Sequence, residues 1–189
     1  MKIICGLGNP GQEYAGTRHN VGFDALNLLA RRHRLEFSGK KFSARFAKGA
    51  IGRESVVMLK PGTYMNRSGQ SVGPAVGFYK LSPEDLIVVH DELDLPLGRV
   101  VVKEGGGTAG HKGLNSIVSS LGTQGFLRVR FGIGRPEHPD HEMADFVLSR
   151  WALSEKKVVE ECLERAADAV ETILDEGVVV AMNRFNAIK

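Results

Sequence analysis

Length, composition and charge are those of an ordinary globular protein, and they exclude several other classes. With 189 residues, of which 42% are hydrophobic and 25% charged, residues 1–189 are expected to form one domain that buries a sizeable core. The apolar runs are too short for a membrane span or a secretory signal, so a cytoplasmic location is expected. Two cysteines without metal-ligand spacing exclude a disulfide framework, and a net charge of +3 does not by itself indicate a nucleic-acid partner.

The chain begins with a strand, a glycine-rich loop and a helix. Residues 2–5 are a short β-rich run that stops at the glycines of residues 6–11. Apolar residues then recur at helical spacing over residues 20–34, and either Asn20 or Thr17 could supply the N-cap side chain.

Further strands and helices follow in alternation. Residues 42–48 and 55–60 form two β-like runs around a short polar turn, which predicts a hairpin. A helix interrupted by glycines is expected up to Tyr79, then a single turn at 82–85, and then a continuous apolar strand over 86–90, the kind that is buried on both faces.

The second half of the chain adds two strands and two helices. The strands are expected at 99–103 and 127–133, and the helices at 111–121 and 154–175. No repeat or linker separates these elements. The sequence therefore predicts an α/β fold: a single domain with a mixed, twisted sheet flanked by helices.

The glycine-rich loop raises the possibility of dinucleotide binding. Residues 6–11 match G-x-G-x-x-G after a strand, but Pro10 and Gly16 interrupt the helix that should open at the glycines. No second strand ends convincingly in an acidic residue at the expected distance. A plain glycine-rich turn is the simpler interpretation, and no cofactor is expected.

Polar residues that could carry chemistry gather where the predicted strands end. They are Asn9, Tyr14 and His19 after the first strand, Tyr64, Met65 and Asn66 after the hairpin, Asp91 after residues 86–90, and His111 after the glycines of residues 105–107. If the strands run parallel, these loops converge on one rim of the sheet. Taken singly, each has a plainer interpretation, such as a turn former or a helix-start residue.

The chemistry that fits these residue types is activation of water by a histidine–carboxylate pair. No serine lies in a G-x-S-x-G pattern and neither cysteine looks activated, which argues against a covalent nucleophile. A carboxylate on one imidazole nitrogen fixes the tautomer, and asparagine amides could donate to a developing oxyanion. His138 and His141 with flanking acids could bind a metal, although a solvated loop is the simpler interpretation and no metal is expected.

Five ordered blocks resemble the signatures of bacterial-type peptidyl-tRNA hydrolases and cover nearly the whole chain. They are Gly6-Leu7-Gly8-Asn9-Pro10-Gly11-x-x-Tyr14-x-x-Thr17-Arg18-His19-Asn20, Lys60-Pro61-x-Thr63-Tyr64-Met65-Asn66, His90-Asp91-Glu92-Leu93-Asp94-Leu95-Pro96, Gly110-His111-x-Gly113-Leu114, and Arg130-x-Gly132-Ile133-Gly134-Arg135-Pro136. The resemblance implies a metal-free and cofactor-free esterase, expected to be a monomer, that cuts a peptide from the 3′ ribose of its tRNA.

The resemblance also implies roles for individual residues. His19 would activate water, Asp91 would hold the basic form of His19, and Asn9 would help to discriminate peptidyl-tRNA from aminoacyl-tRNA. The substrate would be bound by Tyr14, Tyr64, Met65, Asn66, His111 and Lys112, and Lys103 and Arg130 would contact tRNA phosphate. One position departs from the pattern, because the family commonly has Asn where this chain has Lys112.

Two rival functions remain open from the sequence. One is a non-catalytic module of the same fold that grips a tRNA end, against which the intact set of His19, Asp91, Asn9 and Asn66 argues. The other is a metal-dependent hydrolase that uses His138 and His141, whose activity a chelator would abolish.

Overall fold

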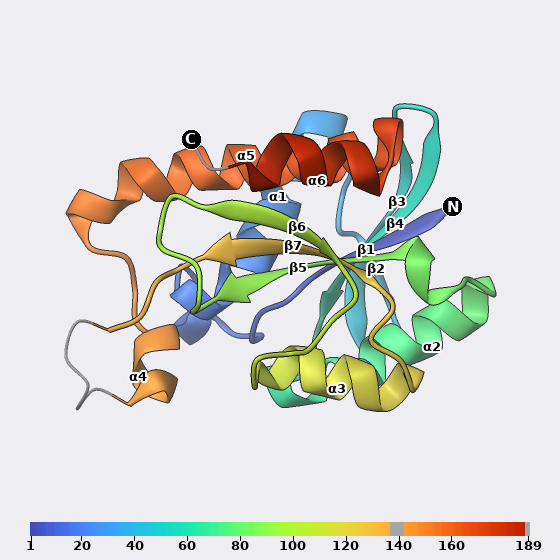
Figure 1. Cartoon of the computed structure of the whole chain (residues 1–189). Coiled ribbons are helices and arrows are strands. Elements are labelled where there is room, and N and C mark those ends of the chain that lie inside the picture. The colour runs from blue at the N-terminus through green and yellow to red at the C-terminus, as the bar shows by residue number, and fades with distance from the viewer. Residues whose placement is uncertain (137–141, 188–189) are drawn as a thin grey trace.

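The computed structural model, which describes residues 1–136 and 142–187, is built on a twisted seven-stranded sheet (Figure 1). The strand order across the sheet is β2-β3-β4-β1-β5-β7-β6. The strands are β1 (Lys2–Gly6), β2 (Gly39–Lys41), β3 (Ala44–Ile51), β4 (Glu54–Pro61), β5 (Leu86–Glu92), β6 (Val100–Glu104) and β7 (Leu127–Gly132). The central strands β4, β1, β5 and β7 run parallel, whereas β2, β3 and β6 are antiparallel to their neighbours. The prediction of a mixed sheet is confirmed.

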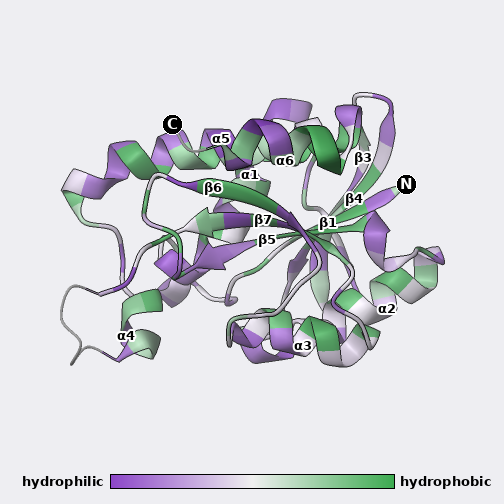
Figure 2. Cartoon of the chain, viewed as in Figure 1, coloured by the Kyte–Doolittle hydropathy of each residue, from purple (hydrophilic) through white to green (hydrophobic). Residues whose placement is uncertain are grey.

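Helices cover both faces of the sheet. The α-helices are α1 (Val21–His33), α2 (Gly69–Tyr79), α3 (Lys112–Leu121), α4 (Met143–Val147), α5 (Lys156–Glu176) and α6 (Val178–Asn186). Helices α1, α5 and α6 lie on one face and α2 and α3 on the other (Figure 1), so that each face has its own apolar core. Hydrophobic and hydrophilic bands alternate along α5 (Figure 2), as expected of a helix that packs by one side. None of the described helices is long and apolar enough to cross a membrane.

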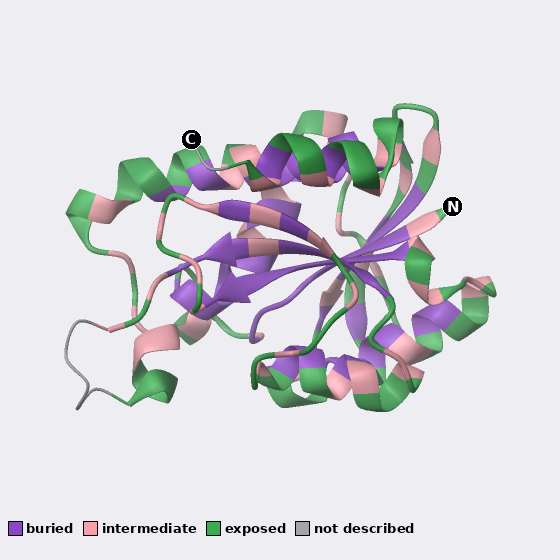
Figure 3. Cartoon of the chain, viewed as in Figure 1, coloured by how far each residue is buried: buried purple, intermediate pink, exposed green. Residues whose placement is uncertain are grey.

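Burial explains why the central strands read as continuous apolar runs. Every residue of β5 is buried, as are four of the five residues of β1 (Figure 3). A parallel strand covered by helices on both faces has no solvent side, so it loses the alternation of an exposed strand. Two polar residues at the carboxyl end of β5, Asp91 and Glu92, are buried with it.

Most predicted elements are confirmed within one to three residues at their ends. The hairpin is present, with Ile51 opposite Glu54 at its tip. The sequence reading missed β2, α4 and α6, which are short elements at the periphery. The predicted capping of α1 is wrong, because neither Asn20 nor Thr17 makes a side-chain cap hydrogen bond at the helix starts they precede.

The direction of β6 changes how the chain reaches the rim. Because β6 is antiparallel to β7, its last residue, Glu104, pairs with Leu127 at the start of β7, at the edge opposite the carboxyl ends of the parallel strands. Residues 105–111 cross back beneath the sheet to α3. The buried guanidinium of Arg128 donates hydrogen bonds to the carbonyls of Gly107, at 2.7 Å, and Gly106, at 2.5 Å, and so holds this crossing in place.

Candidate active site

His19 lies on a single 3-10 turn, Arg18–Asn20, between β1 and α1, and its neighbour Arg18 holds that turn. The Arg18 guanidinium bonds Glu155 through both terminal nitrogens, at 3.1 and 2.9 Å. It also lies over the rings of Trp151, at 4.3 Å, and Phe146, at 4.6 Å. A planar cation that is paired and stacked in this way has little freedom, so the turn that carries His19 is held against α4 and the segment that follows it.

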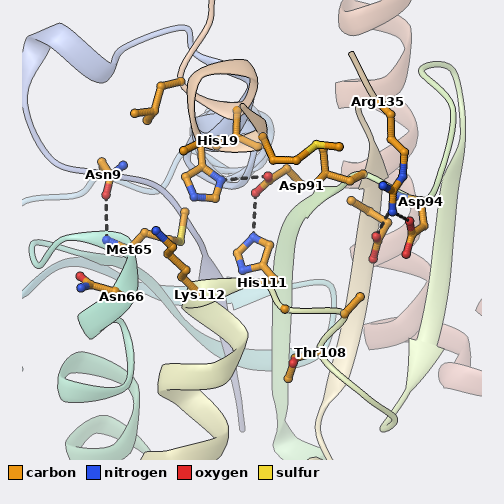
Figure 4. Close-up of a pocket in the computed structure, with 18 of the residues that line it drawn as sticks. Asn9, His19, Met65, Asn66, Asp91, Asp94, Thr108, His111, Lys112 and Arg135 are labelled. Carbon is orange, nitrogen blue, oxygen red and sulfur yellow. Dashed lines mark hydrogen bonds and ion pairs between the residues drawn. The ribbon is translucent and has the colours of Figure 1, made fainter. Parts of the chain in front are cut away.

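Asp91, near the end of β5, joins two histidines (Figure 4). Its Oδ2 lies 2.9 Å from Nδ1 of His19, and its Oδ1 lies 2.9 Å from Nε2 of His111. The Asp91 side chain is 2% exposed, and the two imidazole rings are 5.3 Å apart between centroids. The structure therefore brings together two residues predicted as catalytic and one, His111, predicted only as a substrate contact.

Backbone amides decide which nitrogen of each ring carries a proton. Nδ1 of His111 accepts from the amides of Gly113, at 3.1 Å, and Leu114, at 3.3 Å. This nitrogen must be unprotonated, so Nε2 of neutral His111 carries the hydrogen and donates it to Asp91. A carboxylate only accepts, so Nδ1–H of His19 donates to the other oxygen. In the neutral ring, Nε2 of His19 then keeps its lone pair and is free to act as a base.

The electrostatics of the pair are set by burial and by the two imidazoles. Burial raises the pKa of the Asp91 carboxyl, but His111 and His19 outweigh burial and hold this pKa well below its usual range. Behind them, burial lowers the pKa of His90 to about 3, and a positive charge on His111 would act in the same direction. His90 donates from Nδ1 to the backbone carbonyl of Asp91 at 2.7 Å. It is therefore a neutral ring that fixes the backbone carrying the carboxylate.

The ligand atoms of His19, Asp91 and His111 lie within 4.8 Å of one another, close enough for the three to be considered as a metal site. The hydrogen bonds argue against that use. A metal needs a lone pair on each ligand nitrogen, whereas the amides that donate to Nδ1 of His111 leave the proton on the nitrogen facing the cluster. The three side chains instead form a chain of hydrogen bonds in which each proton has a fixed position. The alternative metal ligands His138 and His141 lie outside the described residues.

Asn9 presents an amide group of fixed orientation to the same space. Its Oδ1 accepts from the backbone N–H of Met65 at 2.7 Å. Its own backbone is held by Asn20, which accepts from the Asn9 N–H at 2.8 Å and donates to the Asn9 carbonyl at 3.0 Å. Because the carbonyl oxygen of the Asn9 side chain is engaged, its NH₂ group is left to donate into the pocket (Figure 4).

These groups line one pocket of about 380 Å³ at the carboxyl ends of β1, β4 and β5. Of the residues predicted from sequence, it is lined by Asn9, His19, Tyr64, Met65, Asn66, Asp91, His111 and Lys112. Tyr14 lies just outside the lining, with its ring edge-on to that of Tyr64 at 6.3 Å between centroids.

The sequence reading missed one wall of this pocket. Helix α4 and the residue after it contribute Met143, Ala144, Val147 and Leu148, and the loop after β5 contributes Leu93 and Asp94. The five residues of α4 are too few to give a helical period. The signal available was the apolar content of this segment directly after a polar loop.

Lys103 and Arg130 lie outside the pocket but share one face of the β6–β7 ladder. Arg130 is opposite Val101, and Lys103 is opposite Arg128, so Lys103 and Arg130 are diagonal neighbours on the face toward α3. Arg130 is partly neutralised by Glu92, with Nε of the arginine 3.1 Å from the carboxylate. The structure thus places these two cations on the same face of β6 and β7.

Comparison with known proteins identifies the family. The sequence model of the peptidyl-tRNA hydrolase family matches residues 3–189. The peptidyl-tRNA hydrolase of Caldanaerobacter subterraneus subsp. tengcongensis is 47% identical over 186 residues, which cover 98% of this chain and all of that protein. That of Sorangium cellulosum is 49% identical over 98% of this chain and 84% of its own length.

Solved structures agree with the sequence comparisons. The crystal structure of peptidyl-tRNA hydrolase from Acinetobacter baumannii superposes with a TM-score of 0.93 at 39% identity, covering 100% of this chain and 96% of that one. Family, length and fold coincide over the whole chain. This chain belongs to the peptidyl-tRNA hydrolase family.

Proposed function

We propose that this chain hydrolyses the ester between a peptide and the 3′ ribose of its tRNA with a water molecule that His19 activates. Membership of the family gives the reaction, the cleavage of peptidyl-tRNA that releases the tRNA. The observation that carries the assignment of roles is the chain of hydrogen bonds through His111, Asp91 and His19, which leaves Nε2 of His19 unprotonated beside the pocket.

In the proposed mechanism the imidazole of His19 carries one proton from the attacking water to the ribose oxygen that leaves. Nε2 of His19 takes a proton from water as the water oxygen bonds to the ester carbonyl carbon, which gives a tetrahedral oxyanion and an imidazolium. The oxyanion then re-forms the carbonyl as the bond to the ribose 3′ oxygen breaks, and the imidazolium returns its proton to that oxygen. The peptide leaves as a carboxylic acid that loses its proton to solvent. Asp91 stabilises the imidazolium in between.

The orientation of Asn9 suggests how a blocked amine is distinguished from a free one. Its NH₂ group can donate to the acyl carbonyl that precedes the last residue of a peptide. An aminoacyl-tRNA carries an ammonium there, which can only donate and would face the NH₂ group of Asn9, also a donor. Two donors that face each other lose a hydrogen bond and also repel, so the Asn9 amide favours peptidyl-tRNA and disfavours aminoacyl-tRNA.

The remaining residues are proposed to hold the tRNA. Tyr14 and Tyr64 lie at the margin of the pocket, where a base could stack on them, and Tyr64 is 55% exposed. Lys103 and Arg130 would contact phosphate, as their shared face and the polyanionic substrate suggest. All of these groups come from one chain, so we infer that the protein acts as a monomer, and that it does so in the cytoplasm, where peptidyl-tRNA is made.

A single-turnover assay on N-acetylated aminoacyl-tRNA tests the proposal. We expect His19→Ala to lower the rate by at least about 10²-fold, the lower end of what a general base contributes, while tRNA binding is retained. His33→Ala is the matched control, because His33 is hydrogen-bonded to Glu171 at the end of α1, away from the pocket. A His19→Ala rate within a few fold of wild type would reject His19 as the base. Binding without hydrolysis in the unmodified protein would favour the RNA-gripping module.

A further inference from the structure

The carboxylates that line the pocket all have partners. Asp91 is bonded to two imidazoles, Glu92 lies 3.1 Å from Arg130, and Asp94 lies 2.5 Å from Arg135 (Figure 4). Glu92 and Asp94 are therefore paired with arginines within the described structure, and both oxygens of Asp91 are occupied by imidazole N–H groups. None of these three carboxylates is paired with a lysine among the described residues.

Lys112 adds a further cation to the lining of the pocket. It lines the pocket, and within residues 1–136 and 142–187 its ammonium makes no ion pair or hydrogen bond. It is also the first residue of α3, where the helix dipole places a partial positive charge that disfavours a cation. A lysine in this position raises the positive potential of the pocket, and an anion in the pocket would lower its energy.

The position of Lys112 puts this charge next to the reacting groups. The start of α3 packs tightly on the turn Met65–Arg67, since a Cβ built on Gly113 would lie 2.6 Å from Sδ of Met65. In Figure 4, Lys112 lies between Asn66 and His111, on the side of the pocket that faces His19. The cation is thus part of the active-site lining.

We propose that Lys112 is the carboxylate-binding group of this pocket, which takes the C-terminal carboxylate of the released peptide. The inference rests on the proposed function, because ester hydrolysis by His19 creates that carboxylate where a neutral ester stood. The tRNA phosphates have their own proposed contacts at Lys103 and Arg130, outside the pocket. The consequence is product inhibition by N-acylated amino acids.

Equilibrium binding tests the proposal without turnover. We would titrate the wild type with N-acetylglycine and with the uncharged N-acetylglycinamide, following pocket resonances by NMR. We expect the acid to bind about two- to fivefold more tightly than the amide at low salt, the range of an exposed ion pair, with the preference shrinking as salt is added. Lys112→Met keeps the stem without the charge and should abolish the preference, whereas Lys112→Arg should retain it.

The matched control is Lys156→Met, because Lys156 is also the first residue of a helix, α5, but lies outside the pocket. It should keep the wild-type preference. Equal binding of acid and amide to the wild type, or a preference that survives in Lys112→Met, overturns the proposal. So does a Lys112→Met variant that loses affinity for adenosine 5′-monophosphate but not for the acid, which would make Lys112 a phosphate contact. Failure of the proposed function would appear elsewhere, as an unmodified protein that does not hydrolyse N-acetylated aminoacyl-tRNA.

Discussion

The carboxylate of Asp91 is the group whose replacement tests the proton network most sharply. In Asp91→Asn one oxygen becomes an NH₂ group, so the side chain can accept from one imidazole but must donate to the other. His111 cannot adapt, because two backbone amides hold its Nδ1 as an acceptor and its Nε2 as a donor. The asparagine oxygen is therefore expected to face His111, which turns the NH₂ group toward His19.

His19 is then forced into the wrong tautomer. To accept from the new NH₂ group its Nδ1 must lose its hydrogen, which moves to Nε2, the nitrogen that we propose takes a proton from water. Loss of the base in its correct tautomer, together with loss of the charge that stabilises the imidazolium, predicts a rate decrease of roughly 10²- to 10⁴-fold. The decrease should not exceed that of His19→Ala. The residual activity should extend to lower pH, because the protonated ring has lost its carboxylate partner.

The assay is single-turnover hydrolysis across pH, combined with ¹⁵N NMR of the histidine rings. The spectra should show the hydrogen of His19 on Nδ1 in the wild type and on Nε2 in Asp91→Asn, with His111 unchanged. Asp168→Asn, which removes a surface carboxylate of α5, is the control and should match the wild type. A fully active Asp91→Asn, or an inactive one in which His19 keeps its hydrogen on Nδ1, would refute the tautomer argument.

Three further predictions concern stability and tRNA binding. Because His90 is held neutral with a pKa of about 3, only the unfolded state protonates this residue as pH falls from 7 to 5, which should lower the free energy of unfolding by about 2 kcal/mol. Urea denaturation at several pH values should show this dependence on pH reduced in His90→Phe. Lys103→Ala and Arg130→Ala should each reduce the slope of log affinity against log salt by roughly one unit for full-length tRNA, and neither should affect a substrate that carries only the terminal nucleotides. Gly22→Ala should cost at least about 2 kcal/mol in the same denaturation assay, since its Cβ would lie 2.4 Å from the backbone oxygen of Val89, and unchanged stability would show that α1 can shift away from the sheet.

The sequence was sufficient to predict the fold class and most of the pocket because both depend on local patterns. An apolar run such as residues 86–90 predicts a buried parallel strand, and polar residues after parallel strands converge by topology alone. Asn9 and His19 follow β1 and Asp91 lies near the end of β5, two strands that run parallel, and the structure brings the three residues to one pocket. No pairwise distance was needed for that inference.

Hydrogen-bond partners that come from distant parts of the chain could not be predicted in this way. Asn20 has the residue type of an N-cap, but its amide instead makes two hydrogen bonds with the backbone of Asn9, which lies in the loop before it. His111 follows β6, an antiparallel strand whose carboxyl end points away from the pocket, and it reaches Asp91 only because residues 105–111 cross back beneath the sheet. Both outcomes depend on tertiary contacts that have no periodicity in the sequence.

The second histidine, His111, determines where the protons lie in the chain of hydrogen bonds. If His111 could take either tautomer, Asp91 could receive or share a proton at either oxygen, and the hydrogen on His19 would not be fixed. The amides at the start of α3 remove this freedom, because a backbone N–H can only donate. Helix α3 thus fixes the tautomer of His111. The His111 ring makes Asp91 an acceptor, and Asp91 in turn fixes the hydrogen of His19 on Nδ1. The helix that begins with Lys112 is therefore also the element that fixes the position of the proton on His19.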